Sequence, residues 1–150
     1  MKALAVIPCG KSKIWDKFPD HGPARADEAY TSPLHRLARS YAEKWADHYI
    51  VLSALHGFLE PSDIVPRAYD VSFNDPHDSR CITVKTLIDQ KKQKRLNRFD
   101  KIVVLAPRAY ADRVLFAFEG DDLEIILALK GKNLFTMMSF LKAARRPGWK

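Results

Sequence analysis

Four continuous apolar runs constrain the fold of this chain most strongly. They are rich in Val, Ile and Leu, and they cover Ala3–Ile7, Tyr49–Ala54, Ile102–Ala106 and Leu123–Leu129. None alternates cleanly between apolar and polar residues. Strands buried on both faces, as in parallel sheets, have continuous runs of this kind, whereas half-exposed strands alternate. The runs therefore predict central, mostly parallel strands.

Helical patterns lie between these runs and after the last one. Ser32 is a good N-cap residue and Pro33 a good first helical residue, and apolar side chains follow at helical spacing as far as Trp45. Three further helices are predicted at about residues 83–96, 109–118 and 134–141. Alternating strands and helices predict a three-layer α/β fold, with about four mostly parallel central strands flanked by helices.

The length of 150 residues is that of one ordinary domain, so we expect a single α/β domain over residues 1–150. No stretch reaches the ~18 apolar residues of a membrane span, and the first run is too short for a signal peptide. We therefore expect a cytoplasmic protein without a membrane partner. The net charge of +7 favours nucleic acid or a nucleotide as partner, although solubility alone also explains it.

Ligands of parallel α/β folds bind beyond the carboxyl ends of the strands. This rule selects four segments, which are Pro8–Lys13, Ser53–Gly57, Pro107–Tyr110 and Lys130–Asn133. Long irregular stretches at residues 13–31 and 56–80 add to the candidate site, because loops of this length are often functional. In the second stretch Tyr69, Val71 and Phe73 alternate with other residues, which indicates a short strand.

The segment after the first run contains Gly10-Lys11-Ser12-Lys13. A P-loop would need a second glycine at position 5, where the chain has Ala5, so the sequence argues against a P-loop NTPase. A glycine turn after a strand still exposes backbone N–H groups. Lys11, Ser12 and Lys13 add donors, and the segment therefore suits a phosphate or a carboxylate.

Cys9, His56 and Asp70 are the candidate catalytic residues. Flanking lysines favour a reactive thiolate at Cys9, and the alternative is a buried small hydrophobic residue. His56 follows Ser53, but the Gly-x-Ser-x-Gly pattern of serine hydrolases is absent. His56 is therefore a general acid or base, or a substrate donor, unless it only bonds the loop backbone. Tyr69 is suited to stack on a planar ligand beside Asp70, and the alternative is an aromatic plug with an exposed carboxylate.

A basic segment ends the second predicted helix, with Lys91, Lys92, Lys94, Arg95 and Arg98. It suits nucleic-acid phosphates or forms a solvated helix face. A second basic cluster consists of Lys142, Arg145, Arg146 and Lys150. The five histidines lack paired ligand spacing and no Gly-x-Gly-x-x-Gly occurs, so we expect neither a metal site nor a dinucleotide cofactor.

Several motifs together resemble an uncharacterised family of bacterial and phage proteins that opens with Cys-Gly-Lys-Ser-Lys. They are Cys9–Trp15, Ala29–Ser32, Leu52–Ala54, His56-Gly57 and Tyr69-Asp70, and they span nearly the whole chain. Pro8-Cys9, Lys13 and Ser32-x-x-His35 are also similar to the core of archaeosine synthase, which modifies a 7-deazaguanine base in tRNA. The uracil-DNA glycosylase fold and the peroxide-stress YaaA family are further distant likenesses.

These likenesses and the strand-end segments predict an enzyme that acts on a nucleobase or nucleoside, free or in DNA or RNA. An N-glycosylase-like hydrolase or a base-modifying transferase fits best. The predicted ligand-binding residues are Gly10, Lys11, Ser12, Lys13, Tyr30, Ser32, His35, Ser53 and Tyr69. Two alternatives are a non-catalytic nucleic-acid binding module and a nucleotide or redox sensor that uses Cys9.

Overall fold

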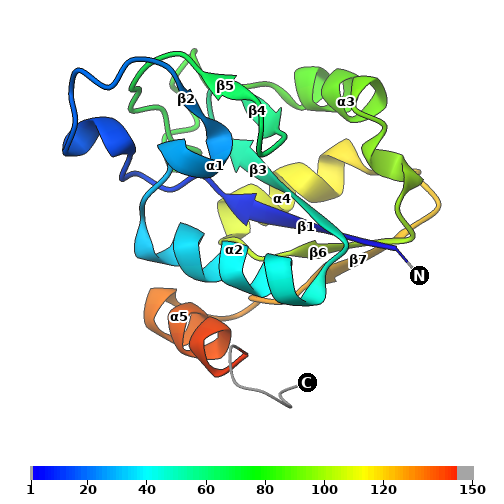
Figure 1. Cartoon of the computed structure of the whole chain (residues 1–150). Coiled ribbons are helices and arrows are strands. Elements are labelled where there is room, and N and C mark those ends of the chain that lie inside the picture. The colour runs from blue at the N-terminus through cyan, green and yellow to red at the C-terminus, as the bar shows by residue number, and fades with distance from the viewer. Residues whose placement is uncertain (1, 145–150) are drawn as a thin grey trace.

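A computed structural model of the chain describes residues 2–144. Its main sheet has five strands in the order β4-β3-β1-β6-β7 (Figure 1). The four parallel strands are β1 (Ala3–Pro8), β3 (His48–Ser53), β6 (Lys101–Val104) and β7 (Glu124–Leu127). β4 (Gly57–Leu59) runs antiparallel to β3 and forms one edge of the sheet. The predicted α/β fold is confirmed, because each apolar run overlaps one parallel strand.

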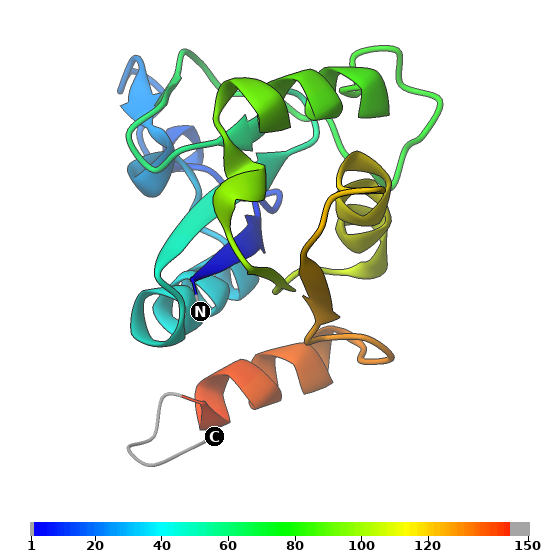
Figure 2. The same ribbon diagram turned by 90° about the vertical axis from the view of Figure 1, so that its right-hand side faces the viewer.

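Helices cover both faces of this sheet. α2 (Pro33–Trp45) packs against α5 (Leu134–Ala143), and α3 (Val84–Gln93) packs against α4 (Arg108–Ala117). Figure 2 shows the two pairs on opposite sides of the sheet. The predicted cap of α2 is confirmed, because the Ser32 side chain accepts a hydrogen bond from the backbone N–H of His35.

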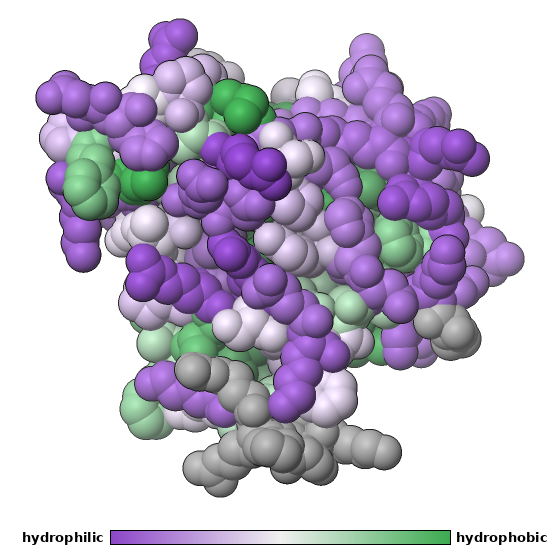
Figure 3. Space-filling model, viewed as in Figure 1, coloured by the Kyte–Doolittle hydropathy of each residue, from purple (hydrophilic) through white to green (hydrophobic). Residues whose placement is uncertain are grey.

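The position of β1 between two cores explains why its sequence is continuously apolar. Leu4 and Val6 belong to one core, which α3 and α4 cover, whereas Ala5 and Ile7 belong to a second core, which α2 and α5 cover. Every residue of β1 is buried. The outer surface is different, since the face seen in Figure 3 is mostly hydrophilic, with only small separate hydrophobic patches.

The irregular stretches contain short elements. The first holds η1 (Ile14–Asp16), β2 (Ala24–Arg25) and α1 (Ala26–Ala29), and β2 pairs with β5 (Ile64–Val65) from the second. The strand expected at Tyr69–Phe73 is absent from the described chain. Val71 and Phe73 instead insert buried side chains into the core from a loop without ladder hydrogen bonds.

The second predicted helix ends earlier than expected. α3 ends at Gln93, because Arg95 adopts the left-handed conformation with φ of 56° and the chain continues as the short helix η2 (Leu96–Arg98). A left-handed residue breaks the repeating hydrogen bonds of a right-handed helix. Leu96 nevertheless remains buried, which is why its apolar side chain matched the helical pattern.

Candidate active site

The loop after β1 packs closely against the start of α2. Gly10 has a left-handed backbone with φ of +74°, and a Cβ atom at this position would collide with the Ser32 hydroxyl. Only glycine combines this conformation with so close an approach. Ser32 Oγ accepts the N–H of His35 at 3.3 Å, and His35 Nδ1 lies 2.7 Å from the carbonyl oxygen of Pro8. The predicted residues Gly10, Ser32 and His35 therefore lie together.

A pocket of about 700 Å³ opens beside this loop. Among the predicted site residues, it is lined by Gly10, Lys11, Lys13, Ser32 and Asp70. Two prolines also line the pocket, Pro8 as the last residue of β1 and Pro107 shortly after the end of β6. The pocket therefore lies at the carboxyl end of the parallel strands. Leu134 is 60% exposed and lines this pocket together with Met138.

A partly buried cluster of hydroxyl groups lies at the end of β3. The hydroxyl of Tyr69 is 2.5 Å from that of Tyr30 and 2.6 Å from Ser53 Oγ. Ser53 Oγ also accepts the backbone N–H of His56 at 3.0 Å. Burial raises the pKa of both tyrosines well above the usual range, so both remain neutral phenols. Tyr69 therefore holds the loop in place, and its hydroxyl is not available to a ligand as long as these bonds persist.

Lys13 connects this cluster to the pocket. It is only 5% exposed, and its ammonium donates to the carbonyl oxygen of Lys11 at 2.9 Å and lies 4.4 Å from the centre of the Tyr69 ring. Burial lowers the pKa of the Lys13 ammonium below its ordinary value. Lys11 is exposed, whereas Ser12 bonds the backbone of Thr31 through its carbonyl oxygen. Ser12 is not among the residues that line the pocket.

Cys9 is 2% exposed and lies behind the pocket wall. Its sulfur is 3.4 Å from the hydroxyl of Tyr110, a residue that lines the pocket. Burial raises the pKa of Tyr110 above the usual range, so this phenol also stays neutral. Cys9 and Cys81 are both free thiols. Tyr110 was not predicted as a site residue, although it ends one of the segments that the strand-end rule selected.

Two buried imidazole nitrogens have no hydrogen-bond partner within the described chain, Nε2 of His35 and Nε2 of His56. Burial lowers the pKa of His35 to about 4, and it also lowers the pKa of His56. Both histidines are therefore neutral at physiological pH. His56 does not line the pocket, and it meets the cluster through an edge-on contact with the Tyr69 ring at 5.1 Å between ring centres.

Comparison with known proteins places the chain in a family. A family model described as "Family of unknown function (DUF6884)" matches residues 4–143. The chain belongs to the DUF6884 family. The "Uncharacterized protein YfjM" of Bacillus subtilis (strain 168) is 40% identical over 145 residues, which are 96% of this chain and 95% of that protein. The expected membership of an uncharacterised bacterial family is thereby confirmed.

One solved structure is also similar to this DUF6884 protein. It is the crystal structure of AF0587, a protein of unknown function, with a TM-score of 0.47 and 14% sequence identity. The match covers 99% of this chain and 46% of AF0587, so the chain spans about half the length of that protein.

Asp70 lies at the rim of the pocket in the DUF6884 structure. Its side chain is 85% exposed and lies 3.3 Å from the guanidinium of Arg80. Arg80 also pairs with Asp78 at 2.8 Å. Asp70 is thus a solvated carboxylate at the pocket mouth, next to the half-buried Tyr69.

The predicted basic surface needs a correction at Lys91. Lys91 is 4% exposed, and its ammonium bonds Asp121 at 2.6 Å and the carbonyl oxygen of Ala117 at 2.9 Å. Its alkyl chain follows the apolar face of α3, so the residue is a core cation and not a phosphate contact. The remaining residues of the segment are Lys92, Lys94, Arg95 and Arg98.

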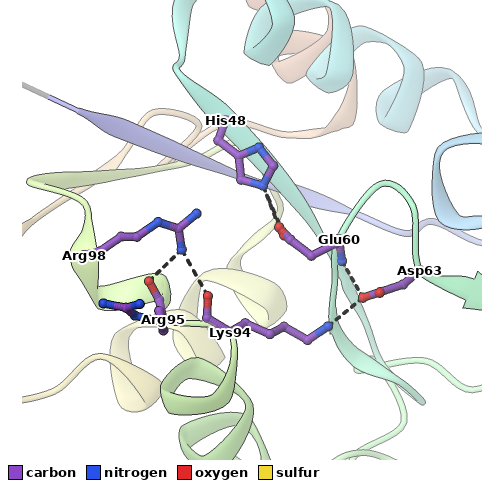
Figure 4. Close-up of polar contacts among 6 residues, drawn as sticks. All are labelled: His48, Glu60, Asp63, Lys94, Arg95 and Arg98. Atoms are coloured by element: carbon purple, nitrogen blue, oxygen red, sulfur yellow. Dashed lines mark hydrogen bonds and ion pairs between the residues drawn. The ribbon is translucent and has the colours of Figure 1, made fainter.

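Internal contacts occupy part of this remaining segment, as Figure 4 shows. Lys94 pairs with Asp63 at 2.5 Å, and the Arg98 guanidinium donates to the carbonyl oxygens of Lys94 and Arg95 at 3.0 and 2.7 Å. Lys92 and Arg95 are exposed. In the second basic cluster, Arg145, Arg146 and Lys150 lie outside the described residues.

No group of three or more His, Cys, Asp or Glu side chains in the described residues has the geometry to hold a metal ion. None of the helices within residues 2–144 is long and apolar enough to span a membrane.

Proposed function

We propose that this protein is a cytoplasmic enzyme that acts on a nucleobase or nucleoside, free or within DNA or RNA, by excising or modifying a non-standard base. The observation that carries the proposal is the pocket of about 700 Å³, where apolar walls meet lysine and hydroxyl groups. Small-molecule sites have this size and this mixture of a mostly apolar lining with a few polar groups.

The lining suits the separate parts of a nucleoside. Val71, Leu134 and Met138 offer apolar surface to the flat faces of a base. Lys11 and Lys13 offer positive charge to a phosphate, or to negative charge that develops during a reaction. The net charge of +7 attracts substrates of this kind over longer distances.

We assign the chemical roles by position. Lys13 stabilises negative charge and, because burial lowers its pKa, releases a proton more readily than an ordinary lysine. Asp70 accepts a proton at the pocket mouth. Cys9 does not line the pocket, so it acts through Tyr110, which lines the pocket and whose hydroxyl it contacts. His56 does not line the pocket, and its ring meets the edge of the Tyr69 ring, so we assign it a supporting role in packing the hydroxyl cluster and no proton transfer.

The likeness to archaeosine synthase points to a deazaguanine-type base. The residues that carry the likeness are in contact, since Ser32 caps the helix turn of His35 and His35 bonds Pro8. Lys13 lines the same pocket as Pro8 and Ser32. Their proximity supports a shared binding site for the motif. The glycosylase likeness agrees with excision as the alternative reaction.

A non-catalytic nucleic-acid binding module is the second candidate. The observation that favours it is the exposure of Lys92 and Arg95 at the end of α3, where cations also complement the helix dipole. In this case the basic surface carries the binding and the pocket does not. A sensor that uses Cys9 is less well supported, because the thiol is only 2% exposed.

A thermal-shift screen tests these proposals. The panel holds free bases, nucleosides, nucleotides and short DNA and RNA oligomers, with deazaguanine and hydroxymethylpyrimidine forms included. Lys11→Met is compared with Lys17→Met, because both lysines are exposed on the same segment but only Lys11 lines the pocket. We expect a base or nucleoside to raise the melting temperature of wild type and of Lys17→Met, but much less that of Lys11→Met.

Compounds that stabilise the protein are then incubated with it and analysed by mass spectrometry for an excised or modified base. Cys9→Ser is assayed in parallel and is expected to bind but to turn over slowly. Stabilisation by oligomers alone, lost in high salt and in Lys92→Glu, would replace the enzyme proposal with the binding module. A panel without any stabilising compound would contradict both.

A further inference from the structure

The outer edge of β7 is open along the part of the chain that the structure describes. β7 ends the sheet on one side, and within residues 2–144 no strand pairs with its outer edge. β4 ends the sheet on the other side, but all its residues are buried, whereas Glu124 in β7 is exposed and the next three residues are half-buried. Figure 2 shows β7 between α4 and α5. β7 is therefore the edge at which another strand can add.

The backbone of β7 has hydrogen-bonding groups directed outward. The N–H groups of Glu124 and Ala128 donate to the carbonyl oxygens of Asp100 and Val104, toward β6. Alternate residues of a strand present their backbone groups to the same side. The N–H groups of Ile125 and Leu127 therefore point away from β6. Ile125 and Leu127 are two residues apart, which is the spacing between successive hydrogen-bonded residue pairs in an antiparallel ladder.

A groove of about 600 Å³ lies beside this edge. Its apolar lining includes Leu115 from α4, Leu127 from β7, Leu129 from the turn after β7 and Met137 from α5. Charged residues complete the lining, and they are Arg108, Asp112, Lys130 and Lys132. Leu115 is 40% exposed. Apolar side chains that flank an open strand edge shield added backbone hydrogen bonds from water, and thereby favour strand addition.

The charges along β7 differ between its two ends. Asp122 and Glu124 are exposed at the start, whereas Lys130 is exposed in the turn that follows and Lys132 lies close to it. A second β7 in antiparallel orientation brings the acidic start of each strand toward the basic end of the other. A parallel orientation brings like charges together. The edge is thus electrostatically complementary to itself in one orientation only.

We propose that β7 pairs antiparallel with β7 of a second copy of this chain, which joins two five-stranded sheets across a two-fold axis near Ile126. The axis is perpendicular to the sheet, so α4 meets the partner's α4 and α5 meets the partner's α5. The dimer buries the groove and pairs the outward N–H groups. The proposal rests on the edge strand, the groove beside it and the charges at its ends, and it does not depend on the proposed function.

The test measures the mass of the full chain by sedimentation equilibrium between about 1 and 100 µM, the range in which modest interfaces associate. Wild type is expected to be dimeric at the upper end. In the double variant Asp122→Lys/Glu124→Lys both ends of β7 are basic, and in the double variant Lys130→Glu/Lys132→Glu both ends are acidic. The homodimer of each variant brings like charges together and is expected to dissociate at least ~10-fold more readily than that of wild type. An equal mixture of the two variants is expected to form a heterodimer.

Leu115→Glu places a charge in the groove and is expected to weaken the dimer, whereas Phe18→Glu, at an exposed site away from β7, is the matched control. Circular dichroism checks that each variant is folded, and if a charge variant is not, the Leu115→Glu comparison decides. A monomeric wild type at 100 µM would overturn the proposal. So would a dimer that persists unchanged in the folded variants.

Discussion

His35 illustrates at the residue scale how burial determines the state of a site side chain. Its ring is fully buried, with Nδ1 on the carbonyl oxygen of Pro8 and Nε2 without a partner in the described chain. A charged imidazole here would lose its hydration without gaining a counter-ion. The ring therefore stays neutral while it holds the end of β1 against α2, next to the Gly10 turn.

The pKa of His35, about 4 in the folded protein against an ordinary 6.5, makes stability depend on pH. Between these values the unfolded chain binds a proton that the folded chain does not. The free energy of unfolding therefore falls as pH decreases from 6.5 to 4, by about 3 kcal/mol from this residue. His35→Asn keeps a donor for Pro8, and we expect it to lose this part of the decrease.

Urea denaturation at several pH values between 7 and 4 measures the effect, within the range where the ordinary and folded pKa values of His35 differ. The exposed His77→Asn is the control and is expected to retain the pH dependence of wild type. An identical pH dependence in His35→Asn and wild type would show that the imidazole is not buried in the neutral form.

At the element scale, α3 carries two adjacent lysines with opposite roles. Lys91 faces inward to Asp121 and lies 5.5 Å from the centre of the Phe118 ring, whereas Lys92 faces solvent. Helical periodicity separates neighbouring residues by a large angle around the axis, which is why a run of basic residues does not form one continuous surface. Lys91 instead joins α3 to the end of α4.

Lys91→Met removes a nearly buried charge and leaves Asp121 without its ion-pair partner. We expect it to lower the free energy of unfolding by about 3 kcal/mol, because breaking a buried ion pair on one side costs several kcal/mol. Lys92→Met makes the same chemical change one residue away, at the surface, and is expected to cost less than about 0.5 kcal/mol. Urea denaturation of the two variants gives the comparison, and equal costs would contradict the inward position of Lys91.

At the scale of the whole molecule, the sheet separates two cores and also joins them. Adjacent residues of β1 enter different cores, so neither core can lose its packing without disturbing the central strand. The pocket depends on this coupling, because its walls include α5 from one side and Val71, which packs in the core on the other side.

Leu87→Ala tests the coupling. Leu87 is fully buried on α3, and its truncation is expected to cost about 2–5 kcal/mol. Because we expect cooperative unfolding, hydrogen exchange should accelerate in α2 and α5 as well as in α3 and α4. Hydrogen exchange with mass spectrometry measures the four helices separately. Acceleration confined to α3 and α4 would show that the two sides unfold independently.

The sequence alone was sufficient to predict the layers of the fold. It also predicted the end of the sheet at which the pocket lies. Continuous apolar runs and the cap at Ser32 are local signals, and burial on both faces leaves an unambiguous pattern. The strand-end rule then selected the segments of Gly10 and Tyr110, because the carboxyl ends of parallel strands share one edge.

Only the tertiary structure decided which side chains are buried, and therefore which ones are available to a ligand. Composition presents Lys91 and Lys92 alike, and only the packing of α3 on α4 distinguishes them. Likewise, the contact of Cys9 with Tyr110 joins residues 101 positions apart, which no local pattern encodes. Burial and long-range contacts depend on how elements pack, whereas strands and helix caps depend on neighbours in the chain.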